Sequence, residues 1–233
     1  MALNPAQARQ IEKQLQEHTH SDYTVDLRLS KGVVLKDFSV HAGVMRPERM
    51  TSVLLARFLL ENKKIYHGKV AMDIGCGSGI QGVTMAAGGA KTVMLSDISA
   101  EAVANSEENV KKYHLETTAQ VLRSDLFGAI CVKADAIIFN HPFFPDSAQG
   151  RAPVARTMLD AGELIHRFLK DAKGFLTGGG RIIMPFFHLA GETNDPSVQG
   201  PKHGYKVREL SYIIELEGLQ RGDISINELR PVK

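Results

Sequence analysis

One stretch of this chain constrains its fold more than any other. An apolar run ends in Asp73 and continues into three glycines spaced two residues apart, Gly75, Gly77 and Gly79. A second apolar run ends eighteen residues after the last of them, in Asp97. This order is typical of a strand, a tight loop, a helix and a second strand that together bind a ligand containing a ribose. An ordinary strand-to-helix turn would use the glycines but would leave the two carboxylates unexplained.

Two details separate the possible ligands of such a loop. The dinucleotide-binding pattern G-x-G-x-x-G requires a glycine at its sixth position. Counted from Gly75, this chain has Ile80 at that position. Asp73 would repel a pyrophosphate in a partly dry cleft, whereas it suits a ligand with an ammonium and a sulfonium group. The pattern D-x-G-x-G-x-G followed by D-I-S therefore resembles the cofactor site of class I S-adenosylmethionine (SAM) methyltransferases.

That resemblance implies a set of cofactor contacts. The three glycines would allow close backbone approach to SAM, and Asp73 would orient the methionine end, directly or through water. Asp97 would accept both ribose hydroxyls. The adenine would lie between the remaining members of the set, Ile98, Asp125 and Leu126, with Asp125 accepting from the adenine amino group.

The rest of the chain predicts a Rossmann-like α/β fold. Apolar runs predict strands at about 69–74, 91–96, 118–123, 135–139 and 180–184, with helices at about 79–87, 99–114 and 156–173 between them. The segment 188–204 is rich in Gly, Pro, Asn and Asp and predicts a loop. Two final strands, at about 206–217 and 224–230, follow without a full helix between them. We therefore expect a doubly wound, mostly parallel seven-stranded sheet with an antiparallel C-terminal edge strand.

The N-terminal part follows a different pattern. Residues 5–18 predict a short amphipathic helix or a frayed terminus, and the alternation within 24–45 predicts a β-hairpin or two short strands. Pro47 is well placed to open a further helix. We expect residues 1–45 to form an extension and residues 46–233 to form the SAM-binding domain.

A second motif, Asn140-His141-Pro142-Phe143, follows the strand at 135–139. It resembles the N-P-P-Y/F motif of methyltransferases that modify planar nitrogen, in the glutamine side chain of release factors or in exocyclic amines of adenine and guanine. The resemblance implies that the Asn140 side-chain oxygen and the His141 carbonyl accept the two N–H groups of the acceptor. Phe143 would stack on the planar group, and Asn140 would also border the cofactor.

This chain departs from that motif, because His141 replaces its first proline. The backbone carbonyl is kept, but rigidity is lost and an ionisable ring is added. His141 could instead act as a general base in the O- or C-methylation of a small metabolite. A third possibility is a buried strand end with Phe143 and Phe144 as core aromatics.

An upstream segment, residues 38–52, is similar to the one that precedes the SAM motif in the release-factor glutamine methyltransferases. Val44, Pro47 and Thr51 match that segment in character, and it would lie over the cofactor pocket. The whole resemblance covers about residues 38–187. The N-terminal recognition domain of those enzymes needs far more than the 37 residues available before it.

The composition of the chain indicates which kinds of partner it can bind. The chain has 233 residues, 43% of them apolar, and a net charge of +2 without a long basic stripe, which favours a small molecule or a protein site over structured RNA as acceptor. Two cysteines, no signal peptide pattern and no long apolar run predict a cytoplasmic protein without a membrane partner. No histidine or cysteine spacing predicts a metal site. A non-catalytic methyltransferase-like subunit and an NAD(P)-dependent oxidoreductase remain as alternatives, the latter disfavoured by Ile80 and Asp73.

Overall fold

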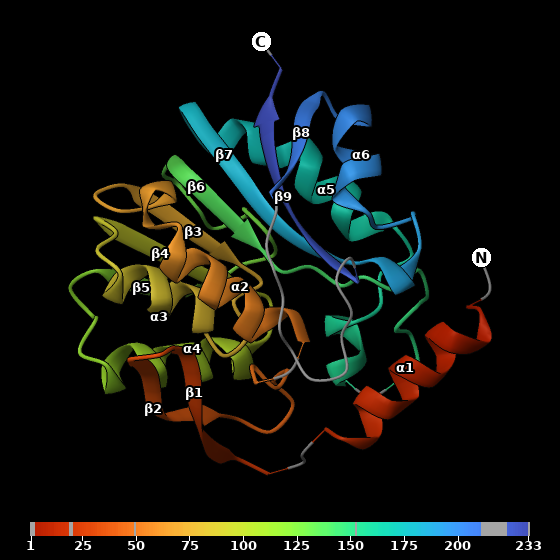
Figure 1. Cartoon of the computed structure of the whole chain (residues 1–233), viewed down its shortest axis with the longest axis horizontal. Helices are drawn as coiled ribbons and strands as arrows, with labels where there is room; N and C mark the ends of the chain where they lie inside the picture. The colour runs from red at the N-terminus through yellow and green to blue at the C-terminus, as the bar shows by residue number, and fades with distance from the viewer. Residues whose placement is uncertain (1–2, 19–20, 49, 152, 211–222, 233) are drawn as a thin grey trace.

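The centre of the fold is a seven-stranded sheet in the order β5-β4-β3-β6-β7-β9-β8 (Figure 1). The computed structural model of the chain describes residues 3–18, 21–48, 50–151, 153–210 and 223–232. The strands of the sheet are β3 (Val70–Ile74), β4 (Thr92–Asp97), β5 (Ala119–Arg123), β6 (Ala134–Phe139), β7 (Leu176–Phe187), β8 (Tyr205–Leu210) and β9 (Ile224–Pro231). Strands β3 to β7 pair in parallel, and β9 is antiparallel to both of its neighbours. The expected α/β fold with a mostly parallel seven-stranded sheet is therefore confirmed.

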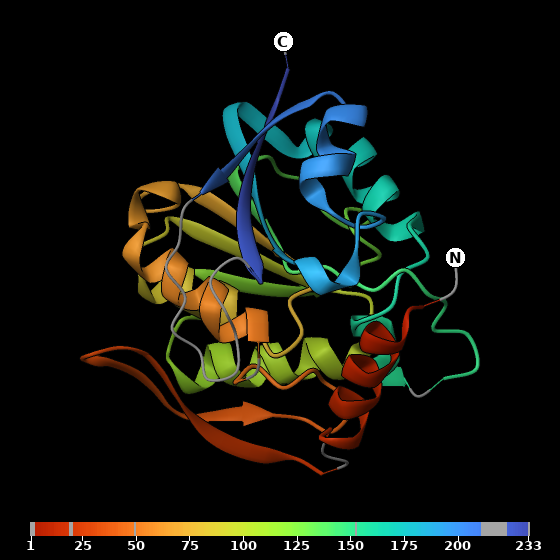
Figure 2. The ribbon, with the colours of Figure 1, turned by 45° about the vertical axis from the view of Figure 1, so that its right-hand side comes forward.

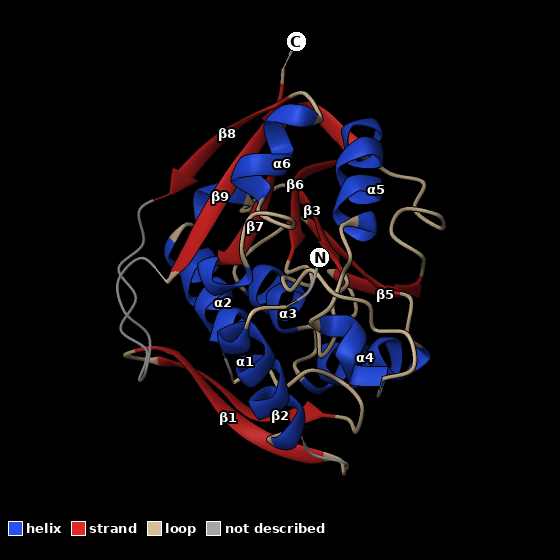
Figure 3. Ribbon diagram, turned by 90° about the vertical axis from the view of Figure 1, so that its right-hand side faces the viewer, coloured by secondary structure: helices blue, strands red, loops and turns tan. Residues whose placement is uncertain are grey.

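Both faces of the sheet are buried. In β6, Ala136 and Ile138 belong to one hydrophobic core, whereas Ile137 and Phe139 belong to the other. This alternation follows from the two-residue repeat of a strand, and burial of both faces explains the continuous apolar runs in the sequence. One face is covered by α2 (Met50–Glu61), α3 (Ile80–Ala87) and α4 (Ala100–Lys112), and the other by α5 (Glu163–Ala172) and α6 (Pro196–Lys202) (Figure 3).

One detail of the sheet differs from expectation. The antiparallel C-terminal strand β9 is not at the edge but lies between β7 and β8, so that β8 forms the edge. Six consecutive residues of β9 are buried, whereas β8 contains three exposed residues. A continuously buried strand pairs on both sides, and the half-exposed strand takes the edge.

Two segments after β6 also differ from the sequence-based expectation. The helix expected at 156–173 begins only at Glu163, because Gly162 has a φ of 101° and the preceding Pro153–Thr157 forms a separate 3₁₀ turn. The expected loop 188–204 contains α6. Asp195 caps this helix by accepting a hydrogen bond from the Ser197 N–H (2.7 Å), and Pro196 occupies its first turn.

The N-terminal segment contains a helix, α1 (Pro5–Gln16), and a hairpin of β1 (Tyr23–Ser30) and β2 (Val33–Val40). The hairpin packs against α2 and α4, below the main sheet in Figure 2. The Gln7 amide of α1 donates to the carbonyl oxygens of Leu189 (3.1 Å) and Ala190 (2.9 Å), just after β7. None of the helices in the described part of the chain is long and apolar enough to span a membrane.

Candidate active site

A cavity of about 1610 Å³ opens at the carboxyl ends of the parallel strands. The carboxyl ends of β3, β4, β5 and β6 all contribute to its wall: Asp97 is the last residue of β4, and Gly75, Asp125 and Asn140 follow the other three strands. Ligands of doubly wound sheets bind at this edge because the strand ends and helix starts converge there. The structure thus brings most of the predicted site residues together around one cavity.

The glycine loop takes the backbone conformation that its sequence predicts. Gly75, Gly77 and Gly79 have φ angles of 65°, 55° and 82°, in the left-handed region that favours glycine. At Gly79 a Cβ atom would also lie 2.9 Å from the Ser106 hydroxyl and 3.3 Å from a methyl group of Leu95. Gly75 and Gly77 line the cavity and can present their backbone to a ligand, which fits the close approach expected for SAM. Gly79 does not line it, and its missing Cβ leaves room for Ser106 and Leu95.

Asp73 lies behind the loop. Its side chain is 1% exposed, it accepts a hydrogen bond from the Gly82 N–H (2.9 Å), and it is not among the residues that line the cavity. Burial, and to a smaller extent the nearby Asp97, raise the pKa of Asp73 to about 7. In this arrangement Asp73 fastens the start of α3 through Gly82, and its contact with the methionine end, directly or through water, stays a prediction.

Asp97 does face the cavity. One of its carboxylate oxygens accepts from the Gly77 N–H and the other from the Ser99 N–H, both at 3.0 Å. Burial raises the pKa of Asp97 above its ordinary value. Each carboxylate oxygen has a further lone pair, so two ribose hydroxyls can still donate to this side chain. Ile98, next to it, is 57% exposed at the cavity wall, as a surface for adenine requires.

The predicted adenine pocket has a complication. Asp125 and Leu126 both line the cavity, but Asp125 forms an ion pair with Arg167 at 2.6 Å. Both side chains are about half exposed, 49% and 54%. Since exposed ion pairs contribute only about 0–1 kcal/mol, an adenine amino group can compete for this carboxylate at small cost.

Asn140 is presented at the end of β6. Its side-chain oxygen accepts a hydrogen bond from the Thr51 hydroxyl, and its amide donates to the Ser52 hydroxyl, both at 3.1 Å. The carbonyl of the following residue, His141, accepts no hydrogen bond from the described part of the chain. Asn140 and His141, the two residues that carry the predicted acceptors, both line the cavity.

His141 is buried. Its side chain is 2% exposed and packs against Phe139, Phe143 and Phe186. The ring nitrogen Nε2 lies 2.7 Å from the Asn194 carbonyl oxygen, and since a carbonyl only accepts, Nε2 carries the proton. Burial lowers the pKa of His141 to about 4. A base this weak disfavours the alternative in which His141 removes a proton from the acceptor.

A hydrogen-bonded lock replaces the rigidity of the missing proline. The side-chain amide of Asn194, which is fully buried, donates to the carbonyl oxygens of Phe143 (3.1 Å) and Asp160 (2.7 Å). Together with the contact to His141, Asn194 holds the loop after β6 on both sides of Pro142. The loop is therefore fixed by a residue fifty-four positions after Asn140, which no pattern near the motif indicates.

This lock predicts a pH dependence of stability. The unfolded chain protonates His141 near pH 6.5 but the folded protein only near its pKa of about 4, so the unfolded state binds more protons between these values. We expect the free energy of unfolding to fall by about 3 kcal/mol as the pH drops from 6.5 to 4. Urea unfolding of the wild type and of His141→Gln, which can donate to Asn194 without titrating, measures this contribution. Parallel pH curves for the two proteins would contradict it, because all other titrating groups are common to both.

A stripe of buried polar residues on α4 supports the glycine loop from outside. Asn105, Ser106 and Asn109 are all 0% exposed. The Ser106 hydroxyl donates to the Gly77 carbonyl, and the Asn109 amide donates to the Ser78 carbonyl, both at 2.9 Å. The positions 102, 105, 106, 109 and 110 have the spacing of a buried helix face. Polar residues at three of these positions are the sequence feature that could have indicated a buried hydrogen-bonding role.

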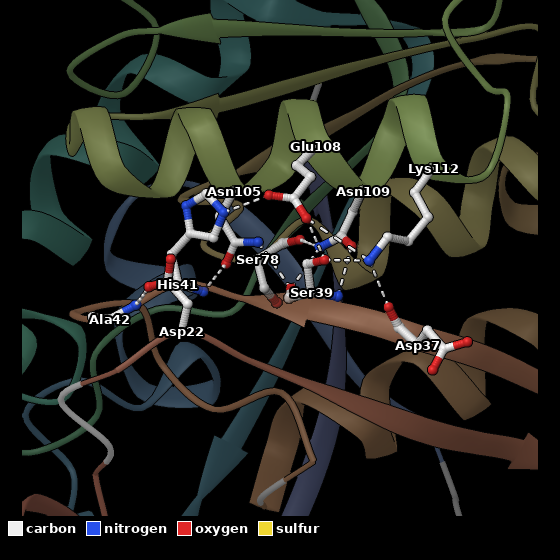
Figure 4. Close-up of polar contacts among 10 residues, drawn as sticks. All are labelled: Asp22, Asp37, Ser39, His41, Ala42, Ser78, Asn105, Glu108, Asn109 and Lys112. Carbon is white, nitrogen blue, oxygen red and sulfur yellow. Dashed lines mark hydrogen bonds and ion pairs between the residues drawn. The ribbon is translucent and has the colours of Figure 1, made fainter.

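The same stripe holds the N-terminal hairpin (Figure 4). The Ser39 carbonyl accepts from the amides of Asn105 and Asn109, both at 2.8 Å, and the Ser39 N–H donates to the Asn109 side-chain oxygen (2.9 Å). At the rim, Glu108 contacts the Ser39 hydroxyl and the His41 ring. One helix face therefore joins the end of β2 to the cofactor loop.

We expect Asn109→Leu to lower the free energy of unfolding by about 2–6 kcal/mol. The substitution keeps the volume but leaves the Ser39 N–H and the Ser78 carbonyl buried without partners, at about 1–3 kcal/mol each. Urea unfolding measures the loss, and titration with SAM should show weaker binding because Ser78 belongs to the glycine loop. The control is Glu108→Gln on the same helix. The Glu108 side chain is 47% exposed, so this substitution should change the free energy of unfolding much less. An unchanged midpoint for Asn109→Leu would contradict this role.

Comparison with known proteins gives the family. A model of the methyltransferase small domain matches residues 38–188, more than half of the chain. The chain belongs to the methyltransferase small domain family. It is a SAM-dependent methyltransferase, as the glycine loop and Asp97 indicate. Among the described residues, no group of three or more His, Cys, Asp or Glu side chains could hold a metal ion.

Two relatives of this methyltransferase are named as glutamine methyltransferases. A Methanocaldococcus jannaschii protein, provisionally named a protein N5-glutamine methyltransferase, is 29% identical over 182 residues, which cover 76% of this chain and 87% of that protein. The release factor glutamine methyltransferase of Borreliella burgdorferi is 36% identical over 107 residues, but these cover only 46% of this chain and 37% of that enzyme.

Solved structures confirm the fold. The T. thermophilus 16S rRNA N2 G1207 methyltransferase in complex with AdoMet and guanosine has a TM-score of 0.67 and 17% identity, and the match covers 92% of this chain and 52% of that one. A ribosomal protein L11 methylase from Lactobacillus delbrueckii subsp. bulgaricus has a TM-score of 0.60 and 18% identity, with coverage of 88% and 98%. At these identities the likeness establishes the fold and leaves the acceptor open.

Proposed function

We propose that this methyltransferase transfers the methyl group of SAM to the nitrogen of an amide or an exocyclic amine. The supporting observation is that Asn140 and His141 line the same cavity as Gly75, Gly77 and Asp97. An amide or aryl amine is a poor nucleophile because its lone pair is delocalised. Two fixed acceptors for its N–H groups would turn that lone pair toward the methyl group and stabilise the positive charge that develops on nitrogen.

We favour a glutamine side chain in a protein as the acceptor. The Methanocaldococcus jannaschii relative, named for glutamine, aligns over 87% of its own length, whereas the T. thermophilus rRNA enzyme is matched over 52%. The net charge of +2 provides little attraction for structured RNA. A nucleobase amine fits the same pair of acceptors and is the second candidate.

We further propose that residues 46–233 form the catalytic domain and that the extension 1–45 helps to enclose the acceptor. Side chains of α1, including Gln10, Lys13 and Gln14, line the same cavity as Asn140. An acceptor approaching Asn140 would then contact this helix. A wall of this kind favours a single side chain or a flipped base over a nucleic-acid duplex.

The test uses SAM with an isotopically labelled methyl group. The full chain is incubated with glutamine-containing peptides and with RNA oligonucleotides that present unpaired adenine or guanine, and the products are hydrolysed and identified by mass spectrometry. The proposal expects N-methylglutamine or an N-methylated base, and Asn140→Ala should not form it. A product methylated on oxygen or carbon, or one formed equally by Asn140→Ala, would refute the proposal.

A further inference from the structure

Two hydroxyl groups at the start of α2 contact the side chain of Asn140. Thr51 donates to its side-chain oxygen and Ser52 accepts from its amide, each at 3.1 Å. The two residues are adjacent in sequence and lie eighty-eight and eighty-nine positions before Asn140. All three line the cavity, so this contact is part of its wall.

The pair uses half of the hydrogen-bonding capacity of the carboxamide. The Asn140 oxygen has two lone pairs and its nitrogen has two hydrogens. With Thr51 and Ser52 in place, one lone pair remains for the N–H of an acceptor, and one N–H remains for another partner. The last side-chain torsion of asparagine is broad, so an asparagine without such contacts would sample many orientations.

The two hydroxyls are themselves held in place. Thr51 is 5% exposed, and as a β-branched residue on a helix it has few accessible rotamers. The Ser52 carbonyl accepts a hydrogen bond from the Gln81 amide (3.0 Å), and Gln81 is 3% exposed on α3, directly after the glycine loop. The start of α2 is therefore joined to the helix that carries the cofactor loop.

We propose that Thr51 and Ser52 are positioning residues that clamp the Asn140 carboxamide in the plane required for methyl transfer. The Thr51 hydroxyl holds the oxygen of the carboxamide and the Ser52 hydroxyl holds its nitrogen, so the two contacts together fix the place and the plane of this group. The clamp is a property of the folded chain, and its catalytic consequence rests on the proposed function. A preorganised acceptor needs no reorientation when the nitrogen substrate enters, which is the basis of positional catalysis.

The test reads the Asn140 side chain directly. The full chain is labelled with ¹⁵N-asparagine, and the Asn140 carboxamide signals are assigned as those that disappear in Asn140→Ser. In the double variant Thr51→Val with Ser52→Ala, we expect these signals to move toward values of a solvent-exposed amide and their hydrogen exchange to accelerate about tenfold, as for two lost hydrogen bonds. Thr51→Ser keeps the hydroxyl and should retain the wild-type signals, which controls for a general loss of packing.

Binding of S-adenosylhomocysteine and turnover of a glutamine peptide complete the test. The double variant should bind S-adenosylhomocysteine within about twofold of the wild type, while its kcat falls about tenfold at a nearly unchanged KM for the peptide. Unchanged Asn140 signals in the double variant would overturn the clamp. A tenfold or greater loss of S-adenosylhomocysteine affinity would also overturn it and assign the hydroxyls to the cofactor. If no nitrogen probe is methylated, the proposed function fails, and the signals of Asn140 still decide the clamp.

Discussion

Replacing Asp97 with alanine should reduce the affinity for SAM and for S-adenosylhomocysteine by about 10²–10³-fold. The carboxylate already accepts from the N–H groups of Gly77 and Ser99, and it is expected to accept two ribose hydroxyls as well. Hydrogen bonds to a charged group contribute about 1.5–3 kcal/mol each, and 1.4 kcal/mol corresponds to a tenfold change in affinity. The substitution also removes the partner of Gly77, so the loop itself becomes less ordered. Calorimetric titration of the purified protein with both ligands measures the loss.

Two matched variants control this prediction. Asp26→Ala removes an exposed carboxylate on the hairpin that does not line the cavity, and it should leave SAM affinity unchanged. Asp97→Asn keeps the shape but places an amide N–H against an N–H donor, so it should resemble the alanine variant. If Asp97→Ala, shown to be folded by circular dichroism, kept the affinity of the wild type, the ribose contact assigned to Asp97 would be wrong.

Replacing Asn140 with alanine should lower the rate of methyl transfer and leave the affinity for the cofactor nearly unchanged, unlike the replacement of Asp97. We expect kcat to fall by about 10²–10³-fold, the loss seen when one preorganised hydrogen-bonding group is removed from a transition state. The affinity for S-adenosylhomocysteine should change by less than about twofold, because cofactor contacts of the glycine loop and of Asp97 are untouched. Steady-state methylation with labelled SAM and calorimetry separate the two effects.

The neighbouring position provides the control for Asn140. His141→Gln should keep the hydrogen bond to Asn194 and the backbone carbonyl, so its activity at neutral pH should stay within a fewfold of the wild type. If His141→Gln were inactive and Asn140→Ala active, the reaction would use the imidazole as a base, and the acceptor would be an oxygen or a carbon. The burial of His141 and its pKa of about 4 argue for the first outcome.

The local sequence predicted where the cofactor side of the site is built. The loop requires positive φ angles, which glycine adopts at low cost, and Asp97 is the last residue of β4, at the carboxyl end of the parallel strands. Parallel strands bring their carboxyl ends together, so the sequence predicts Asp97, Asp125 and Asn140 at one cavity, and all three line it. The direct or water-mediated contact of Asp73 with the methionine end stays a prediction, and its burial behind the loop favours an indirect effect.

The acceptor side depended on contacts that sequence patterns do not encode. The protonation state of His141 follows from burial and from the Asn194 carbonyl, which is supplied by a segment between β7 and α6 that the composition indicated only as a loop. Asn105 and Asn109 have the spacing of a buried face but the residue types of a solvated one. Their role became visible only with the hairpin packed against α4.

The sequence by itself therefore determined the sheet, the cofactor and the position of the candidate catalytic asparagine. These follow from hydrophobic periodicity and from the backbone requirements of glycine, which act over a few neighbouring residues. The tertiary structure decided which strand lies at the edge, that His141 is neutral and locked, and that Thr51 and Ser52 reach Asn140. Those outcomes depend on desolvation and on hydrogen bonds between segments far apart in the chain, and such terms exist only after the segments have packed.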